Sequence, residues 1–226
     1  MNPLPRVSLQ WTASSVALDD FLHYQVWRRV SGQTEAEAIR LSTGRITDRS
    51  RTFYDDYTVA SGVVYEYNIT QLSDVSGETV ESDFGTWVQV SATFGQLYVH
   101  DVASPQYYAN LMAQAQQMNP VQEMAFLQPF SRAAPSARVG DVLQTVYQAS
   151  LRGSWGNARG EIARQQWDAL MTLLARQRDA GAVLCIRQAQ GVRFFGVMEA
   201  PSRSDEAAGQ FREEVRFREV HYPEAG

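Results

Sequence analysis

The three histidines and the single cysteine are the first residues to consider for catalysis or metal binding. His23, His100 and His221 lie in separate regions of the sequence, and no pair has the H-x-x-x-H spacing of a metal site. Cys185 stands in an apolar segment with no histidine close to it in sequence, whereas a cysteine nucleophile needs an adjacent base. We therefore expect solvated or structural histidines and a cysteine that packs as a small apolar side chain.

Two adjacent carboxylates, Asp55 and Asp56, have the residue type needed for acid–base catalysis or Ca²⁺ binding. Ca²⁺ takes about six to eight oxygen ligands, and no D-x-D-x-D loop accompanies the pair. We interpret the two carboxylates as the opening of the turn after a strand. Gly153, Gly156 and Gly160 do not form a phosphate-binding loop, because that loop requires a lysine. They predict a tight connection between a strand and a helix.

Composition excludes several further classes of function. All 20 basic residues are arginines, which excludes a Walker A loop and Schiff-base chemistry, since both depend on lysine. The formal net charge of −5 disfavours general nucleic-acid binding, because phosphate contacts need an excess of positive charge. We expect no membrane insertion, because no apolar run has the length of a membrane helix. The N-terminus lacks the pattern of a secretory signal, and the lone cysteine excludes an intrachain disulfide, so nothing indicates an oxidising compartment.

The elements that must position these residues begin with a series of strands. A length of 226 residues suggests one or two domains. The segments 7–11, 21–30 and 63–69 alternate in side-chain character, and turn residues separate them. One face of each segment contains, in order, Val7, Leu9 and Trp11; Leu22, Tyr24, Val26 and Arg28; Val63, Tyr65, Tyr67 and Ile69. Several short strands at this spacing predict a β-sandwich over residues 1–94.

Four strand regions in this part resemble those of a known family. "VSLQW", "YQVWRR", "FYDD" and "GVVYEYNI" are similar in order and spacing to the B, C, E and F strands of a fibronectin type III domain. Trp11 stands where that family has its core tryptophan, and Tyr65 where it has the tyrosine of the corner between strands E and F. The Leu-x-Pro that precedes this tyrosine in the family is replaced here by "VASG". The resemblance implies a fibronectin type III-like β-sandwich over residues 1–94.

Residues 95–138 differ from the strands before them. Between 95 and 130 the only acidic residues are Asp101 and Glu123, and the segment is rich in apolar side chains. "GQLYVHD" predicts a strand that leaves the sandwich, and "PQYYANLMAQAQQMNP" predicts a short helix between Pro105 and Pro120. Because its apolar content is too high for a solvated linker, we expect an ordered connector.

Residues 139–226 have the element order strand, helix, hairpin, strand. "VLQTVYQASLRG" predicts a strand, and "EIARQQWDALMTLLARQRDAG" predicts an amphipathic helix with a C-cap at Gly181. Its apolar stripe contains Trp167, Leu170, Met171 and Leu174. The segment 183–200 predicts a β-hairpin, and a polar loop leads from it to a last strand at 211–222. A single helix among antiparallel strands indicates an α+β unit in a chain that is otherwise mainly β.

Charges of both signs alternate along the last strand. Arg212, Glu214, Arg216 and Arg218 share one face of it. A solvated face is the ordinary interpretation. The alternative is a face that meets charges of a neighbouring subunit, since arginine favours bidentate pairing.

The second half of the chain resembles the split-barrel domain of long-tailed bacteriophage tail proteins. The similarity lies in the element order and in three segments, "QQWDALMTLLARQRDAGAVLCIR", "GVRFFGVME" and "VRFREV". The resemblance implies a split β-barrel with one packed helix over residues 139–226. It also implies that the hairpin at 183–200 is the sheet edge that meets a neighbouring copy in a ring around the tail lumen. Ring closure with six copies is implied, with a hub of three as the alternative.

Two classes of function remain after this search. The first is a structural component of a long-tailed phage tail, a minor tail, distal tail or baseplate ring protein, whose partners are copies of itself and other tail proteins. It implies assembly in the bacterial host cytoplasm and a place in the virion tail. The second is a host-surface or carbohydrate-binding adhesion module. We expect no enzyme, because the sequence offers no convergent acid–base pair, and we assign no catalytic, cofactor-binding or metal-binding residues.

Overall fold

A computed structural model describes residues 3–111, 115–127, 136–154, 158–206 and 210–224. The chain is mainly β, with one α-helix among these residues. It divides into two compact units. The N-terminal unit contains Asn2–Tyr98 together with two later segments, Arg187–Arg193 and Tyr222–Gly226, and the C-terminal unit contains Val99–Ile186 and Phe194–His221. The two later segments of the N-terminal unit, Arg187–Arg193 and Tyr222–Gly226, are not predicted by the sequence pattern.

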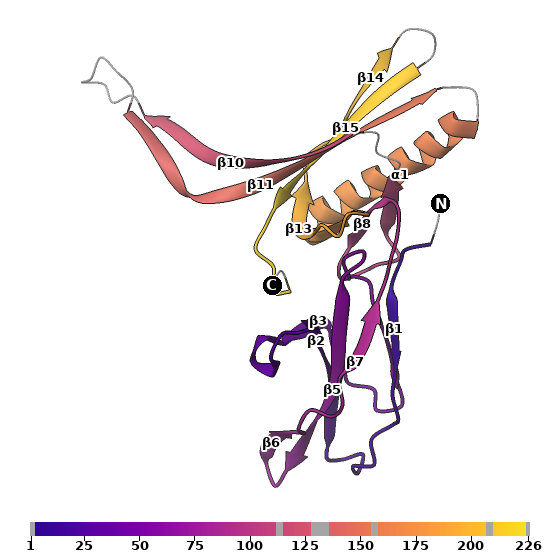
Figure 1. Cartoon of the computed structure of the whole chain (residues 1–226), viewed down its shortest axis with the longest axis vertical. Coiled ribbons are helices and arrows are strands. Elements are labelled where there is room, and N and C mark those ends of the chain that lie inside the picture. The colour runs from indigo at the N-terminus through magenta and orange to yellow at the C-terminus, as the bar shows by residue number, and fades with distance from the viewer. Residues whose placement is uncertain (1–2, 112–114, 128–135, 155–157, 207–209, 225–226) are drawn as a thin grey trace. The chain divides into compact units, whose positions relative to one another are not determined.

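The N-terminal unit is built from two antiparallel sheets and a short 3-10 helix at Glu35–Glu37 (Figure 1). One sheet pairs β1 (Val7–Gln10) with β4 (Phe53–Asp56). The other has the order β3-β2-β5-β6, with β7 also paired to β5. Its strands are β2 (Phe21–Val30), β3 (Ile39–Ile46), β5 (Val64–Val75), β6 (Glu78–Glu81) and β7 (Val88–Ser91). Strands β6 and β7 thus share β5 as their partner.

Apolar side chains from both sheets form one core in this unit. The predicted alternation of buried and exposed residues is confirmed in β1, whereas residues on both faces of β2 and β5 are buried. The core contains Val7, Leu9, Tyr24, Val26, Leu41, Ile46, Tyr54, Val59, Ala60, Tyr65 and Tyr67. Trp11 is only partly buried and packs against the core through an edge-on contact with Tyr24 at 5.4 Å between ring centroids. Trp11 is therefore a border residue of the core rather than its centre.

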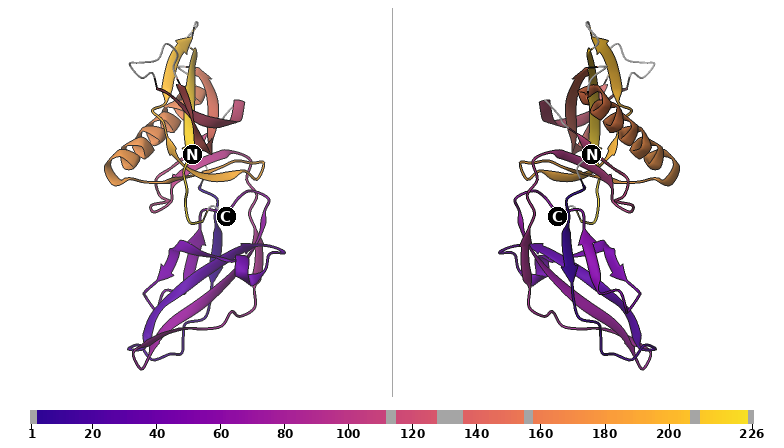
Figure 2. Two further views of the ribbon diagram at one scale, coloured as in Figure 1. Left: turned by 90° about the vertical axis from the view of Figure 1, so that its left-hand side faces the viewer. Right: turned by 90° about the vertical axis from the view of Figure 1, so that its right-hand side faces the viewer.

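The C-terminal unit contains an eight-stranded sheet and the helix α1 (Ala158–Ala180) (Figure 2). The strand order is β10-β11-β15-β13-β12-β8-β9, and β14 also pairs with β15. The strands are β8 (Leu97–Asp101), β9 (Tyr108–Leu111), β10 (Ala115–Leu127), β11 (Ser136–Ser154), β12 (Leu184–Arg187), β13 (Arg193–Met198), β14 (Ser202–Glu206) and β15 (Gln210–Glu219). The strand β14 occupies much of the segment expected to be a polar loop.

The short helix expected between Pro105 and Pro120 was a wrong prediction. Strands β9 and β10 occupy that segment, and β10 continues past Pro120. Helix propensity is a weak preference that tertiary pairing overrides. Here β10 pairs with β11 from Ala115 to Leu127, with one register shift, and proline is tolerated because β10 is the end strand of the sheet.

The helix α1 was predicted correctly in extent and in its C-cap. Gly181 has φ +63° and donates its N–H to the Gln177 carbonyl. The buried face of the helix differs from the predicted apolar stripe, however. Leu170 and Leu173 are fully buried, whereas Trp167, which belongs to the predicted stripe, is only partly buried. The helix packs against β9 and β11.

The hairpin at 183–200 is present as β12 and β13, but it is not a sheet edge. Strand β13 lies between β15 and β12, and β12 lies between β13 and β8. Phe194 and Phe195, on opposite faces of β13, are both buried within this chain, at 6% and 1% exposure. The expectation that this hairpin provides the edge for a neighbouring copy is therefore wrong, since the sheet order ends on β10 and β9.

The predicted charged face of the last strand exists and is paired within the chain. Along β15, Phe211, Val215 and Phe217 are buried, while Arg212 and its neighbours of the same parity are partly or fully exposed. Arg212 pairs with Glu214 at 3.0 Å, and Arg218 with Glu199 at 3.1 Å. These exposed pairs satisfy charge locally and contribute little to stability.

Candidate functional site

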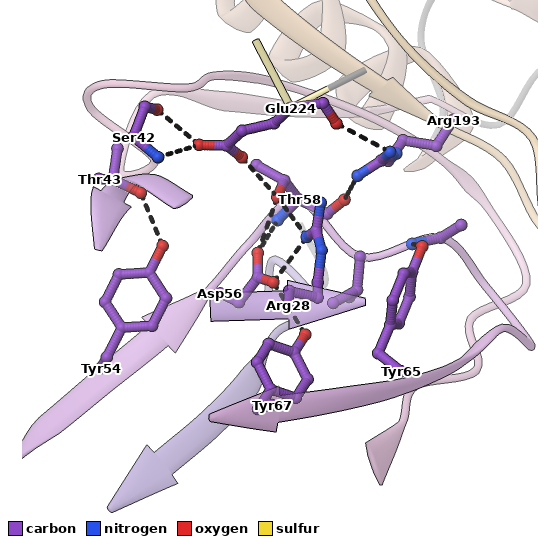
Figure 3. A network of polar contacts seen from close by, with 12 residues as sticks. Arg28, Ser42, Thr43, Tyr54, Asp56, Thr58, Tyr65, Tyr67, Arg193 and Glu224 are labelled. Carbon is purple, nitrogen blue, oxygen red and sulfur yellow. Dashed lines mark hydrogen bonds and ion pairs between the residues drawn. The ribbon is translucent and has the colours of Figure 1, made fainter. Parts of the chain in front are cut away.

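The N-terminal unit contains a buried polar network centred on an ion pair between Arg28 and Asp56 (Figure 3). The Arg28 Nη1 lies 2.7 Å from one carboxylate oxygen of Asp56, and both side chains are almost completely buried, at 1% and 0% exposure. Tyr67 donates its hydroxyl to the same oxygen at 2.8 Å. The other oxygen accepts from the backbone N–H of Thr58 at 2.7 Å and from its hydroxyl at 2.8 Å. Four donors therefore surround one carboxylate.

Strand alternation explains how these side chains meet. Arg28 has the same parity in β2 as Tyr24 and Val26, so its side chain enters the core with theirs. Tyr67 points inward from β5 for the same reason, and Asp56 is the last residue of β4. A charge inside an apolar core requires a paired and hydrogen-bonded partner, which Asp56 supplies.

The C-terminal segment of the chain completes the network. Glu224 is buried, and its carboxylate accepts hydrogen bonds from the backbone N–H and hydroxyl of Ser42 and from the Thr58 hydroxyl. Tyr222 shares a hydrogen bond with the Ser42 hydroxyl at 2.8 Å. Arg193 donates to the backbone carbonyl of Glu224 at 3.0 Å (Figure 3). The segment 222–224 is thus held by side chains from three separate parts of the unit.

The turn of the β12–β13 hairpin is attached to the same unit by two arginines. Arg187 is buried and donates to the carbonyls of Val59 at 3.2 Å and Pro5 at 3.1 Å. Its guanidinium also lies 5.1 Å from the ring centroid of Phe94. Arg193 donates to the Thr58 carbonyl at 3.2 Å. The turn of this hairpin therefore supplies arginine donors to backbone carbonyls of the N-terminal unit.

The environment fixes the charge states of the central pair. Burial opposes ionisation of Asp56, but the Arg28 charge and the hydrogen bonds from Thr58 and Tyr67 outweigh it, so the pKa of Asp56 lies below its usual range. Burial also opposes the charge on Arg28, and the Asp56 carboxylate reverses this, so the pKa of Arg28 is raised. Burial and the Asp56 charge raise the pKa of the Tyr67 phenol. At neutral pH the network holds a charged pair and a neutral phenol.

The burial and hydrogen bonds of the Asp56 carboxylate suit a structural ion pair rather than acid–base catalysis. A general acid or base must reach the proton that it transfers. The Asp56 carboxylate is fully buried and is already bonded to Arg28, Thr58 and Tyr67. Its neighbour Asp55 has a different environment, close to Arg6 and Ser8 near the surface. The two adjacent carboxylates therefore do not converge on one site.

The residues weighed first for chemistry lie apart in the structure. His23 is buried in β2, where burial and the Arg45 charge lower its pKa. His100 is buried in β8, His221 is exposed, and Cys185 is buried in β12. In the described part of the chain, no three His, Cys, Asp or Glu side chains gather where they could hold a metal ion. Gly156 lies outside the described residues.

A second cluster lies on the outer surface of the five-stranded sheet. We define the aromatic face as Trp27, Phe84, Trp87, Arg29 and Arg40. Phe84 lies 5.2 Å from Trp27 and 5.1 Å from Trp87 between ring centroids. Arg40 stacks over Trp27 at 4.7 Å, and Arg29 over Trp87 at 4.1 Å. The core of this unit is built from other side chains, so core packing does not explain why two tryptophans and a phenylalanine gather on the outer surface of the sheet.

Part of this site was visible in the sequence. Arg28 shares the apolar face of its strand, and a charge at such a position requires a buried partner. No local pattern pointed to Asp56 as that partner, nor to Glu224, which returns from the far end of the chain. In comparisons with known proteins, no family model matches the sequence, and no curated protein matches it. Among the described helices, none combines the length and apolar character needed to cross a membrane.

Proposed function

We propose that this chain is a structural component of a long-tailed bacteriophage tail, as a minor tail, distal tail or baseplate ring protein. Its partners are further copies of itself and other tail proteins. The order strand, helix, hairpin, strand, realised as β11, α1, β12–β13 and β15, supports a tail-type split-barrel unit. Assembly takes place in the host cytoplasm, and the protein becomes part of the virion tail.

The topology of the N-terminal unit supports the fibronectin type III-like part of this proposal. The order β3-β2-β5, with β6 and β7 after it, and the separate pair β1-β4 match the two sheets implied for such a domain. Tyr65, near the start of β5, accepts a hydrogen bond from the Ala60 N–H at 3.1 Å. A tyrosine hydroxyl bonded to backbone a few residues upstream is the contact of the E–F corner in such sandwiches.

The observation that carries the assembly proposal is the edge strand β10. It is 13 residues long, and its only partner in the described sheet is β11 (Figure 1). Residues 136–145 of β11 pair with β10 alone, because β15 joins β11 only from Val146 onward. A long unpaired edge promotes association and is normally shortened or blocked in proteins that stay monomeric. Here it supplies backbone donors and acceptors for a strand of a neighbouring copy.

The position of Pro120 indicates which backbone N–H groups of β10 point to the open edge. Proline within a sheet stands where its missing N–H would face away from the partner strand. Backbone direction alternates along an antiparallel strand, and the register is unbroken from Ala115 to Gln122. Gln116 and Met118 therefore direct their N–H groups to the open edge, and Gln117 directs its N–H to β11.

This parity gives a matched pair of variants for the experiment. Gln116→Pro removes an edge donor and leaves the β10–β11 ladder intact, whereas Gln117→Pro removes a ladder bond. We expect Gln116→Pro to reduce self-assembly in sedimentation velocity runs while the melting temperature of the chain is unchanged. Gln117→Pro should lower the melting temperature. Assembly of Gln116→Pro at the wild-type concentration dependence would contradict the edge-strand proposal.

A further inference from the structure

We propose that Trp27, Phe84 and Arg40 of the aromatic face form one wall of a binding groove for a neutral oligosaccharide. This proposal does not depend on tail assembly. A groove of about 520 Å³ lies beside Trp27 and Phe84, and its remaining wall includes Glu35, Glu81 and Asp83. Binding sites for small molecules have volumes of about 300–1,000 Å³ and combine ring surfaces with a few polar groups.

The groove is held in shape by bonds within the unit. The Asn68 amide donates to the Gly85 carbonyl at 2.8 Å and accepts from its N–H at 3.3 Å, which fixes the segment between β6 and β7 that carries Phe84. Glu81 accepts from the Trp27 indole at 3.2 Å and from Arg40 at 2.7 Å. A ligand that enters this groove meets side chains that are already ordered, so little conformational entropy is lost on binding.

Charge indicates which ligands this groove disfavours. Glu35, Glu81 and Asp83 against Arg40 give a formal charge of −2 along the wall. Anionic ligands such as phosphates and uronic acids are repelled by this balance. Cationic ligands would stack on indole rings, but Arg40 and Arg29 already occupy that role over Trp27 and Trp87.

Backbone pairing argues against an extended peptide as the occupant. Peptides that add to a sheet need an edge with unpaired backbone groups. The open edges of this sheet belong to its end strands β3 and β6, whereas the two rings of the groove lie elsewhere: Trp27 on β2, which is paired on both sides, and Phe84 between β6 and β7. A neutral saccharide fits what remains, because its C–H faces pack on the Phe84 ring beside the arginine-covered indoles, and its hydroxyls donate to carboxylates and accept from a guanidinium.

The test is titration calorimetry of the full chain with defined tetrasaccharides. The neutral probes are tetramers of glucose, galactose, mannose and N-acetylglucosamine, and the anionic probe is tetragalacturonate. Phe84→Ala removes a groove wall, and Asp83→Ala removes an exposed carboxylate from it. Phe53→Ala is the matched control, because Phe53 is an aromatic residue 55% exposed on β4 with an arginine, Arg51, over its ring.

We expect at least one neutral tetramer to bind with a Kd below about 1 mM. Phe84→Ala should weaken this binding about tenfold or more, Asp83→Ala should weaken it measurably, and Phe53→Ala should leave it unchanged. Circular dichroism checks that Phe84→Ala folds. If Phe84→Ala does not fold, the binding of Asp83→Ala decides whether the groove binds the saccharide. The proposal is overturned if no neutral tetramer binds, if tetragalacturonate binds more tightly, if the groove variants bind like Phe53→Ala, or if this face binds a protein and no saccharide.

Discussion

Removing one member of the Arg28–Asp56 pair should destabilise the N-terminal unit at least as much as removing both. Asp56→Asn keeps the size of the side chain but leaves the Arg28 charge in a site with 1% exposure. Arg28→Met leaves the Asp56 carboxylate buried without its cation. Each single change should cost about 3–5 kcal/mol, the usual effect of an uncompensated buried charge. The double variant Arg28→Met/Asp56→Asn contains neither charge and should cost no more than either single change.

The assay is urea denaturation of the full chain, with the double-mutant cycle evaluated at one temperature. Replacing Trp155 and Trp167 with Phe leaves Trp11, Trp27 and Trp87 as fluorescence reporters of the N-terminal unit. Because the double variant should cost no more than one single change, the coupling free energy of the pair should be at least as large as a single effect, about 3–5 kcal/mol. In thermal scans, each single variant should then melt roughly 10–20 °C below the wild type. Single effects that add within about 0.5 kcal/mol would refute the conclusion that the two charges depend on each other.

Three further predictions follow from specific contacts. Glu224→Ala should lower the stability of the N-terminal unit by about 1–3 kcal/mol in the same assay, because the part-buried hydrogen bonds from the Ser42 N–H and hydroxyl lose their acceptor, whereas the exposed Glu78→Ala should have no effect. Gly196→Ala should cost about 1–3 kcal/mol in thermal denaturation of the full chain, because its Cβ would lie 2.6 Å from the Arg218 carbonyl oxygen. The control is Gly95→Ala, which has open space around the added Cβ, and equal melting temperatures of the two variants would contradict the close approach at Gly196. The pKa of Asp56 is lower in the folded chain than in the unfolded chain, where it is about 3.9. The ionised carboxylate therefore stabilises the fold fully above the unfolded-state pKa, and this stabilisation is lost as pH falls through the folded-state pKa. We expect the free energy of unfolding, measured from pH 5 to pH 2, to fall less steeply in Asp56→Asn than in the wild type.

The local elements could be predicted from the sequence where side-chain periodicity was strong. Strands β1, β2 and β5 and the helix α1 follow directly from alternation, helical spacing and the Gly181 cap. The segment 106–119 was misread because alanine, glutamine and methionine favour helices, while its actual partner, β11, is set by pairing across the chain. Propensity carries no information about such partners.

The candidate site depended even more on contacts distant in sequence. Arg28 could be recognised as a charge on a core-facing position, but Asp56 lies 28 residues further along, and Glu224 reaches Thr58 across 166 residues. The role of the hairpin was misjudged for the same reason. The resemblance to the tail-protein split barrel implied an open edge here, whereas the structure gives β13 a strand on each side. Only the three-dimensional order of the strands identifies β10 as the open edge.

Self-assembly of the purified full chain is the central claim, and negative-stain electron microscopy tests it most directly. The account predicts closed rings of six copies, or of three if the protein forms a hub, at concentrations where sedimentation shows assembly. It also predicts that Gln116→Pro gives isolated particles of single-chain size under the same conditions. Wild-type protein that remains a uniform population of single chains at every concentration would contradict the account.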